Sequence, residues 1–322
     1  MTDARQPVLR VSDLTVTFGK GVHAVSAVAG VSFEVYEGET LGLVGESGCG
    51  KSTTGKALMK IVTPSSGTVE LDGIDVTHQR GRALRRARTR MQMIFQDPIS
   101  SLNPRRRVRD IVAEPLDAWK SVRGAARNQL VTELLNQVGI DPEVYGDRYA
   151  RQFSGGQCQR ISIARALAMR PKLLICDEVV SALDVSVQAQ ILNLLEDLKD
   201  EYGLTLLFIA HDLAVVKNVS DRVAVMYLGR ICEIGPSDAL YEAPAHPYTK
   251  FLLGAALEAD PDSTVAGSAL EGEPPSPLDP PSGCRFRTRC PFATERCAAE
   301  EPALTEVAPG HQVACHFPFV AQ

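Results

Sequence analysis

The sequence predicts an α/β fold built on a largely parallel sheet, with a helical insert and a small cysteine-rich extension. A short buried strand, Thr40–Val44, runs into a glycine-rich turn, and a helical pattern begins at Lys51. Strands and helices alternate again later, with a helix at about 186–202 carrying apolar residues at helical spacing. Such alternation indicates a parallel sheet. The later β-rich runs are Leu173–Cys176, Leu206–Ala210 and Val223–Met226.

Composition limits the classes of protein that fit. The chain has 322 residues, 44% apolar and 23% charged, and a net charge of −5. Such a mildly acidic chain is not a general nucleic-acid binder. Its longest apolar runs are strand-sized, far short of the roughly 20 residues of a membrane span. Residues 1–10 hold two arginines and no apolar core of a secretory signal, so we expect a cytosolic chain of about two domains.

Shifts in composition suggest the domain organisation. We expect a first domain over residues 1–257, with early strands at 8–16 and 31–35 and a helical insert at about 105–170. Six prolines between 258 and 283 indicate an irregular connection. Residues 284–322 form the cysteine-rich segment. The helix after Lys51 should place one group of apolar residues on one side, namely Ala57, Leu58, Ile61 and Val62.

A phosphate-binding loop is the most specific motif in the chain. It matches the pattern G-x-x-x-x-G-K-[ST] at every fixed position and lies between a strand and a helix, as the motif requires. Its glycines let backbone amides face a phosphate, its lysine adds positive charge, and its serine hydroxyl can bind Mg²⁺. The loop comprises Gly45, Glu46, Ser47, Gly48, Cys49, Gly50, Lys51 and Ser52, followed by Thr53.

Two further segments suit phosphate chemistry. The strand at 173–176 ends in Asp177 and Glu178, which could orient Mg²⁺ and accept a proton from water. A helix start carries two glycines between Ser154 and Gln157. It could bind an anion or serve only as a helix cap. Alone, each of these patterns is a weak indication of function. The two carboxylates become a strong indication because they follow a phosphate-binding loop in the same chain.

Together these motifs resemble the ATP-binding-cassette ATPases. The element Ser154, Gly155, Gly156, Gln157 is similar to the family signature, with Phe153 where many members have leucine. Gln96 matches the Q-loop, Ser181–Asp184 the D-loop and His211 the switch histidine. Phe18 is a candidate for stacking on adenine, although an early-strand aromatic is more often a core residue. Val179 departs from the proline usual after the catalytic glutamate.

The resemblance implies a mechanism. Two such domains would pair head to tail, each ATP lying between the phosphate loop of one and the signature of the other. Ser52, Gln96 and Asp177 would hold Mg²⁺. Glu178 would be the general base, and His211 would contact the γ-phosphate.

Further matches point to the oligopeptide/dipeptide importer branch. They are the segment 96–105, the phrase His246-Pro-Tyr-Thr249 and the tail from Pro280 to Pro291. This branch implies a second, different ATPase chain, two permease subunits and, indirectly, an extracytoplasmic peptide-binding protein. The location implied is the cytoplasmic face of the bacterial inner membrane.

Two other functions stay open. A soluble cassette ATPase could act on nucleic acid or ribosomes, but such proteins carry long coiled-coil inserts or two cassettes, which this chain lacks. A scaffold that binds but does not hydrolyse ATP is disfavoured by Glu178 and His211. Six arginines between 80 and 90 favour a solvated helix face or contact with anionic lipid over nucleic acid, because no aromatics interleave them. We expect no nucleic-acid partner.

Four cysteines in the tail suggest a metal centre. The set is Cys284, Cys290, Cys297 and Cys315. Structural zinc sites usually show C-x₂₋₄-C spacing, which is absent here, whereas iron–sulfur ligation tolerates varied gaps. In the resembled importers this pattern is associated with a 4Fe–4S cluster, so we expect that cluster, with zinc as the alternative. His311 and His316 are substitute ligands of lower rank.

Overall fold

The computed structural model describes residues 6–21, 24–258 and 273–319. The chain divides into two compact units. The first consists mainly of residues 79–207, with residues 36–38 and the segment up to Val8. The second contains residues 9–35, 39–78 and the chain from Phe208 onward. Most of the connection expected at 258–283 lies outside the described residues.

An antiparallel sheet forms the beginning of the second unit. Its strand order is β2 (Val25–Tyr36), β1 (Pro7–Phe18), β4 (Ser66–Leu71) and β5 (Ile74–Asp75). Strands β1 and β2 are longer than the segments 8–16 and 31–35 that the sequence predicted. β1 alternates buried and open positions, as expected of a sheet with one face covered.

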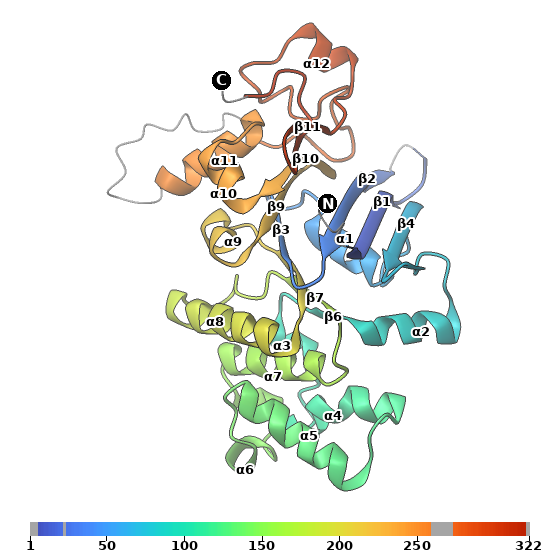
Figure 1. The fold of residues 1–322 in the computed structure, drawn as a ribbon, viewed down its shortest axis with the longest axis vertical. Coiled ribbons are helices and arrows are strands. Elements are labelled where there is room, and N and C mark those ends of the chain that lie inside the picture. Colours follow the sequence, from blue (N-terminus) through green and yellow to red (C-terminus); the bar gives the residue numbers. More distant parts are fainter. Residues whose placement is uncertain (1–5, 22–23, 259–272, 320–322) are drawn as a thin grey trace, which may run out of the picture. The chain divides into compact units, whose positions relative to one another are not determined.

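A second sheet of this unit carries the phosphate loop. Within the unit the order is β3 (Thr40–Val44), β9 (Arg222–Tyr227), β10 (Arg230–Pro236), β12 (His311–Val313) and β11 (Thr305–Ala308). β3 and β9 are parallel, and the later pairs are antiparallel. All five residues of β3 are buried, which fixes the strand that leads into the loop. The cysteine-rich segment therefore contributes two strands to the sheet, at its orange-to-red end in Figure 1.

Helix α1 (Lys51–Leu58) is shorter than predicted. The sequence placed Ile61 and Val62 on its buried face, but Ile61 is 50% exposed. The helix stops because Lys60 adopts a left-handed backbone with φ 53°, and the amide of Ile61 bonds back to the carbonyl of Lys56 at 2.8 Å. The other helices of the unit are α9 (Leu213–Val219), α10 (Ser237–Glu242), α11 (Pro247–Glu258) and α12 (Glu295–Ala299).

The first unit combines a parallel strand pair with helices. β6 (Met91–Ile94) lies parallel to β7 (Leu173–Asp177), with Ile94 opposite Cys176. β8 (Thr205–Ile209) contains the boundary between the units. The helices are α2 (Gly81–Arg90), α3 (Pro98–Ser101), α4 (Val108–Trp119), α5 (Gly124–Gln137), α6 (Pro142–Tyr145), α7 (Gly155–Leu167) and α8 (Val185–Tyr202).

Apolar faces of these helices form the core of the first unit. On α8 the four residues predicted to share a face are all buried: Ile191, Leu194, Leu195 and Leu198. α7 packs against α3, α4 and α8. The buried apolar residues of the helices that precede α7 include Ile111, Leu116, Leu134 and Leu135. The strands and helices together confirm the predicted α/β fold class. Helices fall within residues 108–167, inside the stretch that the sequence predicted to be helical.

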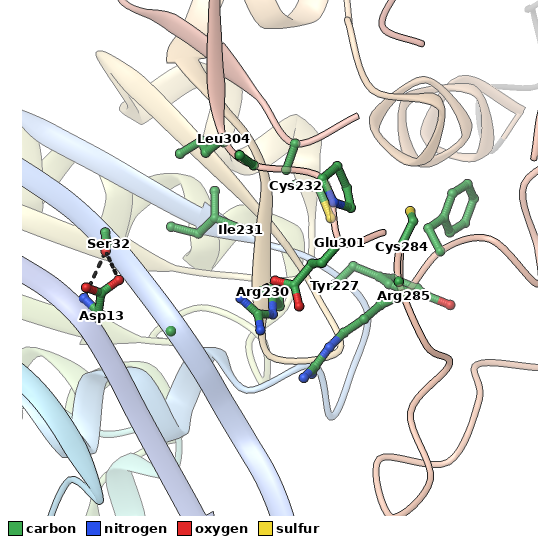
Figure 2. Close-up of a pocket in the computed structure, with 16 residues that line it drawn as sticks. Asp13, Ser32, Tyr227, Arg230, Ile231, Cys232, Cys284, Arg285, Glu301 and Leu304 are labelled. Atoms are coloured by element: carbon green, nitrogen blue, oxygen red, sulfur yellow. Dashed lines mark hydrogen bonds and ion pairs between the residues drawn. The ribbon is translucent and has the colours of Figure 1, made fainter. Parts of the chain in front are cut away.

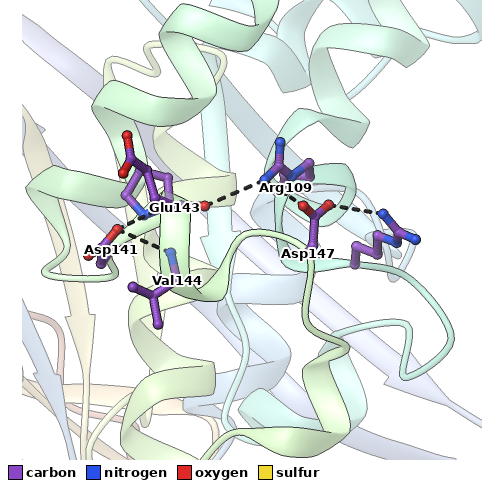
Figure 3. Close-up of polar contacts among 7 residues, drawn as sticks. Arg109, Asp141, Glu143, Val144 and Asp147 are labelled. Atoms are coloured by element: carbon purple, nitrogen blue, oxygen red, sulfur yellow. Dashed lines mark hydrogen bonds and ion pairs between the residues drawn. The ribbon is translucent and has the colours of Figure 1, made fainter.

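Charged pairs fasten the loop that joins α6 to α7. The carboxylate of Asp147 accepts from Arg107 and Arg109, each at 3.0 Å (Figure 3). Asp141 caps α6 by accepting from the amide of Glu143 at 2.9 Å. Both arginines thus pair with the same carboxylate.

Helix α2 contains no buried residue: Arg82, Arg85 and Arg86 are exposed, while Arg88 and Arg90 are half-buried. None of the described helices has the length and apolar character needed to cross a membrane.

Candidate nucleotide-binding site

Two glycines of the phosphate loop are required by close packing. At Gly45, with φ 150°, an added Cβ would lie 2.1 Å from the carbonyl oxygen of Met226. At Gly50, with φ 109°, it would lie 2.1 Å from the carbonyl of Ala27. No side chain fits at either place. Both strands β9 and β2 therefore shape the loop.

Lys51 is held inside the loop. Its side chain is nearly buried, and its ammonium donates to the carbonyls of Gly45 at 2.7 Å and Glu46 at 3.0 Å. Burial raises the pKa of the neighbouring Cys49 thiol, although Lys51 opposes the shift. Ser52 and Thr53 follow on the first turn of α1. The loop thus carries a fixed positive charge at a helix N-terminus, as anion binding requires.

In the first unit, the parallel pairing of β6 and β7 brings Gln96 to Glu178. Gln96 follows the end of β6, and Asp177 and Glu178 lie at the end of β7. The amide of Gln96 donates to a carboxylate oxygen of Glu178 at 2.7 Å. Asp177 is buried. Carboxyl ends of neighbouring parallel strands are the usual place for such residues.

The backbone of Glu178 is unusual. Its φ is 50°, in the left-handed region that side chains other than glycine rarely adopt. The turn is fastened by Ser181, whose amide and hydroxyl both donate to the carbonyl of Glu178, at 3.2 and 2.9 Å. Val179 is buried behind this turn. The turn is therefore held by hydrogen bonds from Ser181 although Val179 stands where proline is usual.

The signature element starts helix α7. The hydroxyl of Ser154 accepts from the amide of Gln157, and the side chain of Gln157 accepts from the amide of Ser154 at 3.0 Å. A Cβ on Gly156 would lie 2.6 Å from Val187 of α8, while one on Gly155 would meet Leu183 at an ordinary 3.6 Å. The cap considered from sequence is thus present, and Ser154 at its start is exposed.

The remaining predicted residues lie near the ends of strands. His211 is exposed and follows β8, next to Asp212, which caps α9. Asp184 of the D-loop caps α8. Phe18, at the end of β1, is 45% exposed, so the alternative of a core aromatic is wrong.

Sequence reasoning missed a buried carboxylate that organises the His246-Pro-Tyr-Thr phrase. Glu233 of β10 is fully buried and accepts from the amides of Ala245 at 2.7 Å and His246 at 2.9 Å. Its other contact is the ring of His311, at 2.7 Å, in β12. Burial lowers the pKa of His246 to about 4 against the opposing charge of Glu233. A lone glutamate in a strand gives no signal in the sequence that it is buried.

The tail lies against β9 and β10. Residues of both elements line a pocket of about 240 Å³, among them Tyr227, Arg230, Cys284 and Arg285 (Figure 2). Arg230 forms an ion pair there with Glu301. The amide of Ala314 also donates to the carbonyl of Cys232 at 2.7 Å. The cysteine-rich segment is therefore packed onto the sheet that carries the phosphate loop.

The four tail cysteines do not form a metal site among the described residues. No group of three or more His, Cys, Asp or Glu side chains in that part of the chain is arranged to hold a metal ion. Burial raises the pKa values of Cys284, Cys290 and Cys315, and the charges of the other thiols add to this. His311 contacts Glu233, and His316 contacts the carbonyl of Glu300. The expected 4Fe–4S cluster is thus not supported by this arrangement.

Two family profiles match the chain. The profile described as "ABC transporter" matches residues 28–181, which include the phosphate loop, the signature and the two carboxylates. The profile described as "Oligopeptide/dipeptide transporter, C-terminal region" matches residues 232–297.

Curated relatives align over nearly the whole chain. A Sinorhizobium fredii protein named "Probable peptide ABC transporter ATP-binding protein y4tS" is 54% identical over 93% of this chain and 84% of its own. The oligopeptide transport ATP-binding protein AppF of Bacillus subtilis is 49% identical over 93% of this chain and 92% of its own.

Solved structures agree with these relatives. The ATP-binding cassette MJ0796, in a dimeric post-hydrolysis state with ADP and Pi, is 28% identical, covers 71% of this chain and 98% of its own, and has a TM-score of 0.64. CbiO1 of Clostridium perfringens, part of the transporter complex cbiONQ, is 29% identical over 73% of this chain and 91% of its own, with a TM-score of 0.66. The chain belongs to the ATP-binding-cassette transporter family, as one of its ATPase subunits.

Proposed function

We propose that this ATPase energises the import of oligopeptides or dipeptides across the cytoplasmic membrane. The observation that carries the proposal is the match of residues 232–297 to the C-terminal region of oligopeptide/dipeptide transporters. That region contains most of β10, the His246-Pro-Tyr-Thr phrase and three of the four tail cysteines. The names of the relatives, which refer to peptide or oligopeptide transport, support the same substrate class.

The catalytic roles follow from the chemistry of the residues. ATP would bind to the loop from Gly45 to Ser52, with Lys51 neutralising phosphate charge. Mg²⁺ would be held by Ser52, Gln96 and Asp177, all oxygen donors suited to this hard cation. The carboxylate of Glu178 would take a proton from the attacking water. His211 would contact the γ-phosphate.

Assembly completes the site. The signature from Ser154 to Gln157 would serve the ATP bound to a second cassette, and the phosphate loop would receive the signature of that partner. We propose a related but different ATPase chain as the partner, with two permease subunits and, indirectly, an extracytoplasmic peptide-binding protein. The location that follows is the cytoplasmic face of the bacterial inner membrane.

Uptake by reconstituted vesicles tests the proposal. The chain should be isolated from native membranes with its co-purifying subunits and incorporated into vesicles that enclose ATP. Uptake of a labelled peptide should require ATP and the binding protein, and Glu178→Gln should abolish it. ATP hydrolysis that no peptide stimulates, or isolation with ribosomes in place of a permease, would contradict peptide import.

A second proposal concerns the tail cysteines. We propose a 4Fe–4S cluster on Cys284, Cys290, Cys297 and Cys315, with zinc as the alternative. Thiolates are the ligands that such clusters use. Binding would require the four side chains to draw together, since metal binding and local folding are coupled.

Metal analysis distinguishes the cluster from zinc. Protein purified without oxygen should be brown and contain roughly four irons per chain. Cys290→Ser should lose the colour, while Cys158→Ser, in the first unit, should keep it. Stoichiometric zinc without iron would establish the zinc alternative. Protein that contains neither metal would contradict both the cluster and the zinc site.

A further inference from the structure

The second residue of the phosphate loop, Glu46, is held through three different groups. Its amide donates to the hydroxyl of Tyr248 at 3.0 Å. Its carbonyl accepts from the ammonium of Lys51 at 3.0 Å. Its carboxylate accepts from Arg289. The backbone position of Glu46 and the place of the Lys51 ammonium are therefore fixed together.

The arginine comes from the cysteine-rich tail. Both terminal nitrogens of Arg289 meet both carboxylate oxygens of Glu46, at 2.8 and 3.0 Å. The Arg289 side chain is only 6% exposed and that of Glu46 is 24% exposed. A bidentate pair fixes the orientation of both groups as well as their distance. Removal of one partner would leave a charge in a poorly solvated place.

An aromatic cluster holds Arg289 in place. Phe286 is buried against Tyr227 and Tyr248, with ring centroids 5.3 Å away in each case. The amide of Arg289 donates to the carbonyl of Phe286 at 3.0 Å, so both residues belong to one turn. Tyr248, which receives the Glu46 amide, is itself part of this cluster. The turn that anchors the tail thus also aims the guanidinium at the phosphate loop.

We propose that Arg289 is a positioning residue for nucleotide binding, which acts by clamping Glu46 and thereby holding the carbonyls that orient Lys51. Tail docking and phosphate binding are then coupled. Coupling free energies are reciprocal, so nucleotide must tighten the docking of the tail by the same factor that the docked tail improves nucleotide affinity. The inference concerns affinity for ATP or ADP and does not depend on which substrate is transported.

Nucleotide titration of the full chain tests the affinity half of the proposal. Arg289→Ala and Glu46→Gln should each raise the Kd for MgADP and MgATP by about 5- to 100-fold. The Kd of the double variant should not exceed that of the single variant with the lower affinity, because each substitution removes the same Arg289–Glu46 interaction. Arg289→Lys should rescue part of the loss, since a single ammonium retains the charge but not the paired geometry.

The control comes from the same tail. Arg296 pairs with Glu300 on the surface, with both side chains more than half exposed. Arg296→Ala should leave nucleotide affinity unchanged. Wild-type affinity in Arg289→Ala, or losses from Arg289→Ala and Glu46→Gln that simply add, would overturn the proposal.

Hydrogen exchange tests the reciprocal half and separates positioning from a merely structural role. In the wild type, MgADP should slow amide exchange in residues 284–299. In Glu46→Gln, whose tail sequence is intact, saturating MgADP should no longer slow it. Equal protection by nucleotide in both proteins would show that the tail and the loop are not coupled. If Arg289→Ala fails to fold, nucleotide titration and hydrogen exchange can both be measured on Glu46→Gln and Arg289→Lys.

Discussion

At the scale of single residues, Glu178 combines backbone strain with a fixed side chain. A left-handed backbone at a residue with a Cβ costs about 1 kcal/mol or more. The strained conformation is maintained because the hydroxyl of Ser181 donates to the carbonyl of Glu178 and the amide of Gln96 donates to its carboxylate. Strain of this kind is common where a side chain must be aimed for chemistry. The motif predicted the identity of this residue, but the strain depends on a turn geometry that the sequence does not reveal.

Glu178→Gln should stop hydrolysis while leaving binding intact. The amide has the same shape but cannot accept the proton, so turnover should fall about 10²- to 10⁴-fold. ATP affinity should stay near the wild-type value because the phosphate loop is unchanged. Phosphate release and nucleotide binding should be measured on the assembled complex. Near-normal turnover would show that another group is the base.

Lys51→Ala should weaken ATP binding and hydrolysis together, because the charge that neutralises phosphate is lost. Titration with ATP and ADP and steady-state turnover measure both effects. ATP and ADP affinities equal to those of the wild type would contradict the assigned role of Lys51.

Phe18→Ala should weaken nucleotide binding on the order of 1 kcal/mol, the smaller effect of losing one stacking contact. The exposed position of the ring is compatible with stacking on a base. Comparison of ATP with a triphosphate that lacks the base isolates this contribution. An unchanged preference for the base would mean that a different residue stacks on it.

At the scale of elements, the signature helix α7 shows how packing and function share residues. Gly156 lets α7 approach Val187 of α8, whereas Gly155 faces ordinary contact distances. The same two glycines open the exposed end of the helix, where a capped but uncovered N-terminus can bind an anion. One tetrapeptide therefore sets both the spacing of two helices and the chemistry at the start of one.

Gly156→Ala should destabilise the protein by about 1–3 kcal/mol, the usual cost of overpacking. The added methyl would lie too close to Val187 for both helices to keep their places. Gly155→Ala is the matched control and should be neutral or slightly stabilising, since alanine favours helix. Urea unfolding of both variants measures the difference. Equal free energies of unfolding for the two variants would show that α8 shifts to accommodate the added methyl without loss of stability.

The elements that the sequence predicted are those whose signals are local. α8 follows from a helical repeat of apolar residues, and β3 and β7 follow from short apolar runs next to motifs. β11 and β12 have no such signal, because both are short and consist mostly of exposed or polar residues. β12 is held by pairing with β10, and β11 by pairing with β12. The early end of α1 depends on the left-handed Lys60, which no apolar pattern predicts.

At the scale of the molecule, Glu233 and the tail show the limit of sequence reasoning. The motifs predict candidate residues for a nucleotide site, because each motif carries its chemical groups within a short segment. The tail lies far from the ATP motifs in sequence, so no local pattern connects it with that site. Its contacts with β10, Tyr248 and Glu46 arise from long-range folding, which spacing along the chain cannot predict.

His246 should make stability fall in mild acid. Its pKa is about 4 in the folded protein, because burial disfavours the charged ring, against 6.5 when unfolded. The unfolded chain therefore binds more protons between these values, and stability falls as pH decreases from 6.5 toward 4, by on the order of 3 kcal/mol in total.

His246→Asn tests this dependence. Asparagine can still accept from the amide of Tyr248, as Nδ1 of His246 does at 3.0 Å, but it does not titrate. Urea midpoints at pH 7 and pH 5 should fall more for the wild type than for the variant. Glu233 and His311 remain in both proteins, so the difference isolates His246. Parallel losses would assign the acid sensitivity to other groups.

The pairing of β10 with β12 also has a consequence during synthesis. Glu233 of β10 pairs with Val313 of β12. During synthesis, the edge of β10 therefore stays unpaired until the ribosome has made β12. At about 5–20 residues per second, the delay is on the order of ten seconds. During that time the nascent chain presents unpaired amides and apolar side chains of β10, an edge that other chains can join. Expression under slow translation should therefore be the condition in which this protein most needs chaperones.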